Sequence, residues 1–203
     1  ARSGVDVASA SLLDDLAIQY SDFAVWEREV LGEDEADDEY AFWRETLAGV
    51  EVLRLPSTLS STVVSKALPP ASVSGMIMAS REAGATVFML VLGLLQARLV
   101  ELVGQTAFAI GTPVSGRSRG ETEGLIGLFV NTVAVRNAAQ PGMPLRDVVS
   151  QARDHSLAAF AHQDLPFDRV VEQVDVARDL ETTPVFQVLL SVMTKDESTV
   201  AVA

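Results

Sequence analysis

Cysteine is the first residue that the sequence lacks, since none of its 203 positions holds one. This absence excludes a disulfide framework, a thiolate nucleophile and a zinc site with cysteine ligands. It also fits a protein that works in a reducing compartment, and we therefore expect a cytoplasmic location.

Positive charge and long apolar runs are scarce too. The chain has 15 Lys and Arg against 28 Asp and Glu, which gives a formal net charge of −13. Nucleic acids and anionic membranes attract basic surfaces, so we predict neither as a partner. The longest apolar run, 87–95, is shorter than the roughly 20 residues that span a bilayer. No signal peptide is visible, and the missing initiator methionine suggests a fragment of a longer polypeptide or N-terminal processing.

Common catalytic signatures are also missing. The sequence has no P-loop, no G-x-G-x-x-G after a predicted strand and no G-x-S-x-G nucleophile elbow. Its two histidines, His155 and His162, lie seven residues apart, whereas a helical metal site usually has tighter spacing. We therefore expect no metal site, a partly exposed surface position for His155 and a position near a helix end for His162.

The residues that are present predict an α/β layer fold. Hydrophobic residues make up 48% of the chain, which is enough for a sizeable core. Long helices that alternate with single strands are typical of layered architectures. Periodicity and cap signals predict the main helices over 36–48, 71–83, 87–103, 145–161 and 167–174. Short apolar runs predict strands over 107–111, 130–135 and 185–193.

The chain shows no internal repeat and no second composition class, so we predict one domain or lobe over 1–203. Within it we expect a frayed start over 1–11 and a flexible, Ser/Thr-rich loop over 57–66. Thr86 is the predicted N-cap of the long apolar helix over 87–103, and Gly104 is its predicted end.

Near the N-terminus, the sequence predicts a loop that leads into a short helix. Phe23, Trp26 and Val30 have helical spacing and share one face, and Asp22 is placed to cap the helix. We expect this aromatic cluster to pack in the core.

Asn131 is the most unusual residue of the predicted strand over 130–135. Side chains alternate along a strand, so Asn131 shares a face with Val133 and Val135. An amide in line with a buried valine row needs hydrogen-bond partners or faces a cavity. It is therefore either a core amide that holds a neighbouring loop, which the bare strand favours, or a site residue.

Three irregular segments are candidates to converge on a cleft: 112–120, the approach to Asn131, and 162–168. Composition and spacing alone assign them no function. Their residues do, however, form part of five motifs that resemble those of nonribosomal peptide synthetase condensation domains, in the order of that family. The motifs are Tyr20-Ser-Asp-Phe-Ala-Val-Trp26, Gly111-Thr-Pro-Val-Ser-Gly-Arg-Ser-Arg119, Ile126-Gly-Leu-Phe-Val-Asn-Thr-Val-Ala-Val-Arg136, His162-Gln-Asp-Leu-Pro-Phe-Asp168 and Arg178-Asp-Leu-Glu-Thr-Thr-Pro-Val185.

The resemblance implies a chloramphenicol-acetyltransferase-like fold, in which two αβα sandwich lobes form a V with a tunnel between them. Carrier proteins, peptidyl and acyl, deliver a donor thioester and an acceptor amine on phosphopantetheine arms, and a peptide bond forms. No cofactor is expected to bind the chain directly. The family's H-H-x-x-x-D-G motif is absent from these 203 residues. The resemblance therefore implies a C-terminal lobe, inactive alone, whose partner is an N-terminal lobe or an adjacent synthetase domain.

The resemblance also implies roles for individual residues. Thr112, Ser115 and Asn131 are expected to line the substrate tunnel. Residues expected at the lobe interface or in structural positions are Asp22, Trp26, Arg117, Arg119, Arg136, His162, Gln163, Asp164 and Arg178. We expect the arginines at 117, 119 and 136 to anchor loops through ion pairs, and His162 not to replace the missing catalytic histidine.

Two other functions stay open at this point. The chain could be a non-catalytic docking module for carrier proteins, or part of a related acyltransferase or epimerase of the same fold. The sequence leaves open which acids are joined, the chirality of the donor, the fate of the missing lobe and the oligomeric state. It also leaves open the true length of the 56–68 segment, which is shorter than is usual in the family.

Overall fold

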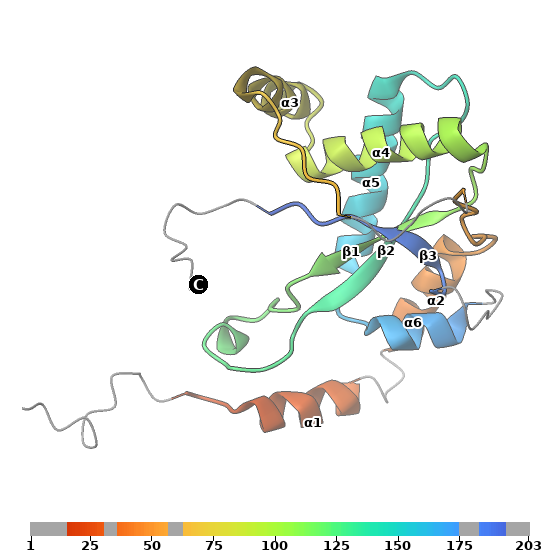
Figure 1. Ribbon diagram of the computed structural model, residues 1–203. Coiled ribbons are helices and arrows are strands. Elements are labelled where there is room, and N and C mark those ends of the chain that lie inside the picture. The colour runs from red at the N-terminus through yellow and green to blue at the C-terminus, as the bar shows by residue number, and fades with distance from the viewer. Residues whose placement is uncertain (1–15, 31–35, 57–62, 175–182, 194–203) are drawn as a thin grey trace, which may run out of the picture.

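A computed structural model describes residues 16–30, 36–56, 63–174 and 183–193 (Figure 1). The described helices are α1 (Tyr20–Val30), α2 (Ala36–Thr46), α3 (Pro70–Glu82), α4 (Val87–Val103), α5 (Leu145–Ala161) and α6 (Phe167–Gln173). A short 3-10 turn, η1, covers Gly120–Thr122, and the strands are β1 (Ala109–Val114), β2 (Asn131–Arg136) and β3 (Phe186–Leu189).

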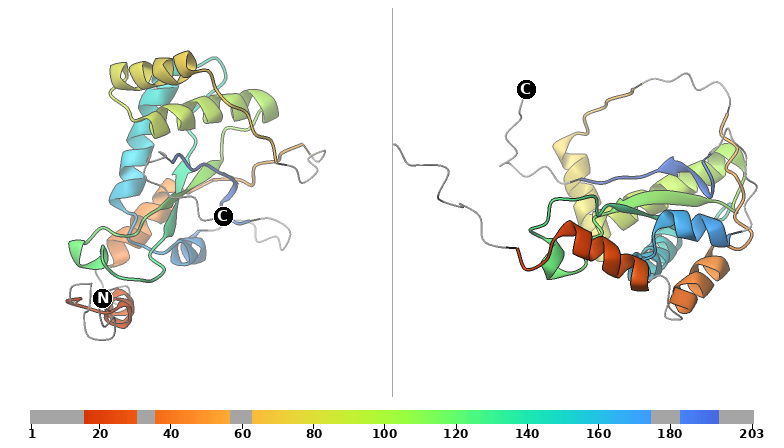
Figure 2. Two further views of the ribbon diagram at one scale, coloured as in Figure 1. Left: turned by 60° about the vertical axis from the view of Figure 1, so that its left-hand side comes forward. Right: turned by 90° about the horizontal axis from the view of Figure 1, so that it is seen from below.

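The three strands form one mixed sheet in the order β2-β1-β3. The central strand β1 runs antiparallel to β2, with Ile110 opposite Val135 and Val114 opposite Asn131. It runs parallel to β3, with Ala109 opposite Phe186. Helix α5 packs on β2 and α4 packs on α5, whereas α6 lies between β2 and α2 (Figures 1 and 2).

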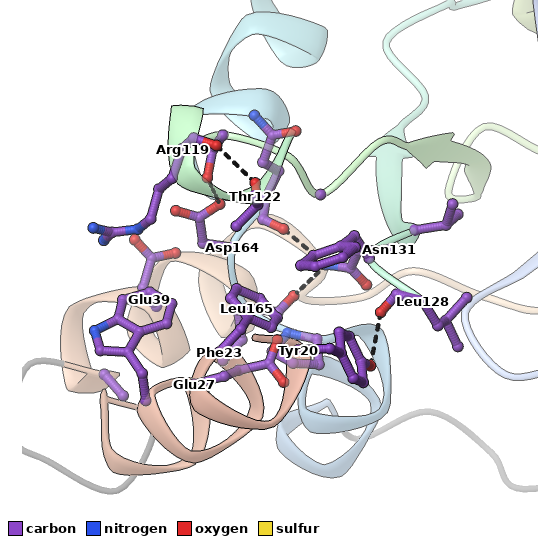
Figure 3. Close-up of a pocket in the computed structure, with 18 residues that line it drawn as sticks. Tyr20, Phe23, Glu27, Glu39, Arg119, Thr122, Leu128, Asn131, Asp164 and Leu165 are labelled. Carbon is purple, nitrogen blue, oxygen red and sulfur yellow. Dashed lines mark hydrogen bonds between the residues drawn. The ribbon is translucent and has the colours of Figure 1, made fainter. Parts of the chain in front are cut away.

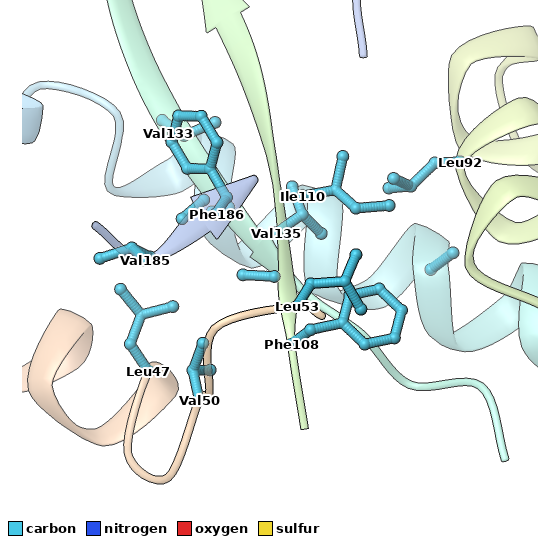
Figure 4. Packing of buried hydrophobic residues seen from close by; sticks show 14 of the residues in the cluster. Leu47, Val50, Leu53, Leu92, Phe108, Ile110, Val133, Val135, Val185 and Phe186 are labelled. Atoms are coloured by element: carbon cyan, nitrogen blue, oxygen red, sulfur yellow. The ribbon is translucent and has the colours of Figure 1, made fainter. Parts of the chain in front are cut away.

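The core lies between this sheet and its helices. Figure 4 shows Ile110 of β1 beside Val135 of β2 and facing Leu92 of α4, with Phe108 just before β1, and all four side chains are buried. Gly93 lets α4 approach α5 closely, because a Cβ there would lie 3.2 Å from the backbone of Val149. These buried residues supply the apolar area that stabilises the layered fold.

The helix signals in the sequence correspond closely to the structure. Helices α4 and α5 have the predicted bounds. The side chain of Thr86 accepts a hydrogen bond from the Met89 N–H at 3.2 Å, which is an N-cap contact. Gly104 ends α4 with a φ of 71°, a left-handed conformation that glycine adopts at low cost.

Two strand predictions were wrong. Thr112 was placed in a loop, but β1 continues to Val114 because its pairing with β2 extends through Asn131. The last strand was predicted over 185–193, but β3 covers only Phe186–Leu189. Val185 has a φ of 70°, which a β-branched residue rarely adopts and which is incompatible with a strand.

Several predictions fall wholly or partly outside the described residues. They are the frayed start over 1–11, most of the flexible loop over 57–66, and Arg178 with most of its motif. In the parts of the chain that are described, no single helix is long and apolar enough to cross a membrane. Helices α3 and α4 would reach the required length and composition only as a pair, and they are bent by 98°.

Candidate functional site

A cavity of about 460 Å³ lies between α1, the loop that joins β1 to β2, and the loop after α5. Aromatic side chains of α1 form one wall, namely Tyr20, Phe23 and Trp26. Phe129, which precedes β2, lines it as well. Asn131, the first residue of β2, lies at the same cavity (Figure 3). Ala36 and Glu39 of α2 line it as well, so four segments of the chain build the cavity, and its size is in the range of small-molecule sites.

Helix α1 is attached through its aromatic face. The Tyr20 hydroxyl donates a hydrogen bond to the Leu128 carbonyl at 3.0 Å. The rings of Tyr20 and Phe23 lie 5.3 and 4.7 Å from that of Phe129. Gly127 makes room for this contact, because a Cβ there would lie 2.2 Å from the Tyr20 ring. The cluster was expected in the core, but it lines a cavity instead, since α1 packs on loops.

Two arginines of the β1–β2 loop complete the attachment. Arg117 donates hydrogen bonds to the carbonyls of Thr122 and Leu125, and its guanidinium lies 4.1 Å from the centre of the Phe129 ring. The guanidinium of Arg119 lies 4.2 Å from the centre of the Trp26 ring. Each contact has cation–π geometry, but only the one between Arg119 and Trp26 reaches α1, whereas Arg117 and Phe129 brace the loop on which the helix packs.

Asn131 uses its whole amide to hold the loop after α5. Its Nδ2 donates to the carbonyls of Gln163 and Leu165 at 2.7 and 2.8 Å. Its Oδ1 accepts from the N–H groups of Thr132 and Phe167 at 2.8 and 3.1 Å. These four bonds fill the capacity of an amide, so Asn131 cannot bind a substrate in this geometry without releasing the loop.

His162 joins the same loop to α2. Its Nδ1 lies 3.0 Å from both carboxylate oxygens of Glu39, and its ring stacks on Phe42 with 3.7 Å between the centres. Trp43 donates its indole N–H to the His162 carbonyl at 3.1 Å. These contacts fix His162 between α2 and the loop after α5.

The cavity contains more acid than base. Among the described residues, Glu27, Glu39 and Asp164 line it together with one arginine, Arg119. Partial burial raises the pKa of Glu27 above its ordinary value, and the nearby negative charge of Asp168 raises it further. Asp164 accepts a hydrogen bond from Ser118 at 3.2 Å. Among the residues described by the structure, no group of His, Asp and Glu has a metal-binding arrangement.

The structure brings only one of the three expected tunnel residues to the cavity. Asn131 lines it, whereas Thr112 is buried within β1 and does not. The Ser115 hydroxyl accepts from the Arg117 N–H at 3.4 Å and lies outside the cavity lining as well. Gln163 and Asp164 line the cavity from the loop after α5.

Two details of the structural residues differ from expectation. Arg136 holds the C-terminal end of α2 by donating to the carbonyls of Thr46 and Ala48 at 2.9 and 2.5 Å, and Arg117 likewise donates to carbonyls. Within the described residues, the polar contacts of Arg117 and Arg136 are therefore hydrogen bonds to backbone carbonyls, where ion pairs were expected. Asp22 lies inside α1, not before it, and reaches back to accept from the Gln19 N–H at 2.8 Å.

Sequence reasoning did not select Glu27 and Glu39 as site residues. Both occupy ordinary helical positions, and only the packing of α1 and α2 against distant loops places them at the cavity. No local sequence signal marks such a position, because the contacts that create it cross most of the chain.

The fold and this cavity define a class of protein, an α/β lobe with a substrate-sized cavity under its first helix. The family is defined by sequence: the model of the condensation domain matches residues 7–201. The chain therefore belongs to the condensation domain family. Its fold is the chloramphenicol-acetyltransferase-like fold of that family, and the predicted fold class is confirmed.

Curated relatives are much longer proteins. Tyrocidine synthase 3 of Brevibacillus parabrevis is 34% identical over 188 residues, which cover 88% of this chain and 3% of that protein. The phosphinothricin tripeptide synthetase PhsC of Streptomyces viridochromogenes is 36% identical over 197 residues, which cover 93% of this chain and 18% of that one. The chain thus spans a small part of the relatives that it matches.

Solved structures show that the similarity extends to the fold, and that the chain again matches only part of each relative. The X-domain from teicoplanin biosynthesis superposes with a TM-score of 0.76 at 26% identity, over 89% of this chain and 43% of that chain. The condensation domain of the monacolin K polyketide synthase MokA superposes with a TM-score of 0.69 at 20% identity, over 90% and 46%. In both comparisons this chain matches less than half of the other.

Proposed function

We propose that the chain is the C-terminal lobe of a condensation domain that forms peptide bonds in a nonribosomal peptide synthetase. The substrates are a donor acyl thioester and an acceptor amine, each carried by a carrier protein on a phosphopantetheine arm. The observation that carries the proposal is the combination of a family match over 7–201 with coverage of only 43% of a solved relative. The relative named as a tripeptide synthetase supports the reaction class.

In this proposal the lobe positions reactants and supplies no proton acceptor of its own. Its two histidines are both in structural contacts: His162 with Glu39, and His155 with the Arg136 carbonyl at 3.0 Å. Holding two activated reactants close together in the right orientation can lower the activation free energy by about 7–11 kcal/mol in the best-oriented cases. The loop that Asn131 holds is part of the positioning surface.

An apolar strip next to the cavity is the face that we assign to the missing lobe. Ile126 and Leu128 precede β2 and are 94% and 75% exposed, and Val130 beside them is exposed as well. Apolar side chains so exposed and so close together are typical of a surface that a partner covers. We therefore expect the isolated chain to dimerise or aggregate, and an Ile126→Ser/Leu128→Ser variant to be less prone to both.

The experiment that tests this function compares the chain alone with the chain joined to a lobe that carries the H-H-x-x-x-D-G motif. Both are mixed with donor-loaded and acceptor-loaded carrier proteins, and the peptidyl product on the acceptor carrier is measured by mass spectrometry. We expect product only from the joined protein. Turnover by the isolated chain would show that the lobe is sufficient, and carrier binding without turnover by the joined protein would favour a docking module.

A further inference from the structure

The cavity under α1 has the chemistry of a cation site. In the part of the chain that the structure describes, three carboxylates line it, those of Glu27, Glu39 and Asp164, and one guanidinium, that of Arg119. The walls between them are aromatic. A ligand with a positive charge on an apolar stem would match both features, because the stem packs on rings while the charge meets carboxylates.

The aromatic walls already hold cations that belong to the chain. The guanidinium groups of Arg117 and Arg119 lie 4.1 and 4.2 Å from the centres of the Phe129 and Trp26 rings. Each of these rings therefore has a guanidinium over one face, and both rings line the cavity, where they offer apolar surface to the stem of a ligand.

Glu27 is the carboxylate best placed to gain from such a ligand. It follows Trp26 on α1 and is partly buried, and both causes that raise its pKa, burial and the charge of Asp168, oppose its ionised form. Glu39 is already paired with His162, and Asp164 already accepts from Ser118. A cation close to Glu27 would offset both penalties on its charge.

We propose that this cavity binds a side chain that ends in an ammonium or guanidinium group, so that the substrate class is a basic aminoacyl unit. A volume of about 460 Å³ accommodates one such side chain with part of its backbone. The assignment of that unit to the substrate of condensation rests on the proposed function, whereas binding of the cation to the cavity does not.

Binding is tested on the full chain by an NMR titration that follows the indole N–H signals of Trp26 and Trp43. The probes are the N-acetyl methylamides of lysine, of norleucine as the neutral isostere, and of glutamate. We expect the lysine probe to shift the Trp26 signal and leave Trp43, with a dissociation constant about tenfold below that of the norleucine probe. Glutamate should bind most weakly.

Two matched variants locate the cation. Glu27→Gln should weaken lysine binding about fivefold and leave norleucine binding unchanged, because it removes a charge and keeps the shape. Glu29→Gln, on an exposed position of the same helix, should change neither. Circular dichroism confirms that each variant is folded. Equal binding of lysine and norleucine, or equal effects of the two variants, would overturn the proposal.

A final measurement separates this inference from the proposed function. The joined two-lobe protein is assayed with acceptor carriers loaded with lysine or with norleucine, and faster condensation of lysine is expected. Peptide bonds formed at equal rates from both would overturn the basic substrate class and leave the condensation function intact. Lysine-selective binding to the cavity without condensation by the joined protein would overturn the condensation function and leave the cation-binding cavity intact.

Discussion

The central strand β1 and the helix α1 are held in the molecule by two different kinds of contact. Strand β1 has a neighbour on each side, and its residues Ala109 and Ile110 are completely buried. Among the described residues, helix α1 contacts loops through one aromatic face, the hydrogen bond of Tyr20 and the guanidinium of Arg119, and Figure 1 shows it apart from the sheet. Its other side is exposed.

This difference predicts two levels of stability in one chain. Burial of apolar area in the sheet region is shared among many side chains, so opening it requires global unfolding. The attachment of α1 depends on a few specific contacts, which can open locally while the core stays folded. Because the candidate cavity lies under α1, the less stable region of the molecule is the one that carries the site.

The largest expected effect comes from the core. Phe108 is 0% exposed, and Phe108→Ala should lower the free energy of unfolding by about 3–5 kcal/mol, since it removes buried area and leaves a cavity. Urea unfolding followed by circular dichroism measures this change. Leu157→Ala, at an exposed position of α5, is the control and should change stability by less than about 0.5 kcal/mol. Similar losses in both variants would refute the picture of a core around β1.

The same contrast separates what the sequence predicts from what it does not. The core elements follow from local signals: the apolar period of α4, the cap at Thr86 and the glycine at 104 all lie within a few residues of the helix that they define. The failure at Thr112 arose from a long-range cause. Its segment is rich in turn-forming residues, and only pairing with β2 makes it a strand.

The cavity lies beyond local prediction for the same reason. Tyr20 and Leu128 are joined by a hydrogen bond across 108 positions, and Trp43 and His162 across 119. Periodicity identifies the face of a helix that is apolar, but not the loop that will cover it. Asn131 was a partial exception, because an amide in a valine row predicts a nearby polar partner without identifying the loop.

The second prediction tests the attachment of α1. Gly127→Ala places a Cβ 2.2 Å from the Tyr20 ring, so the ring must move and the helix loosens. Overpacking of this kind costs about 1–3 kcal/mol, so amide hydrogen exchange over α1 should accelerate at least about fivefold while α4 is unaffected. The Trp26 indole signal should shift and that of Trp43 should not.

Gly120→Ala is the matched control for this experiment. It lies in the same loop, its φ is not in the left-handed region, and a Cβ there would meet no atom within 4 Å. Faster exchange in α1 after both substitutions, or equal acceleration in α1 and α4 after Gly127→Ala, would contradict a locally attached helix.

The smallest effect concerns pH. Burial and the charge of Asp168 raise the pKa of Glu27 while α1 is packed on the loops, which we call the docked state. When α1 is released, the Glu27 carboxyl has its ordinary pKa of about 4.3, so it loses its proton at a lower pH than the docked carboxyl does. Docking of α1 should therefore weaken above that pH relative to a Glu27→Gln variant, and the difference should level off once the docked carboxyl ionises too. Below pH 4 the two proteins should dock alike.

The Trp26 indole signal, recorded from pH 3.5 to 7 in both proteins, measures this difference. The control Glu29→Gln should show the same pH dependence of α1 docking as the wild type. Tighter docking of α1 in the wild type than in Glu27→Gln at pH 7 would contradict the prediction. A bound cation provides the sharper comparison. It favours the ionised carboxylate, so it should lower the pKa of Glu27 and remove the loss of docking at neutral pH. The site would then strengthen the weaker region of the molecule only when its ligand is present.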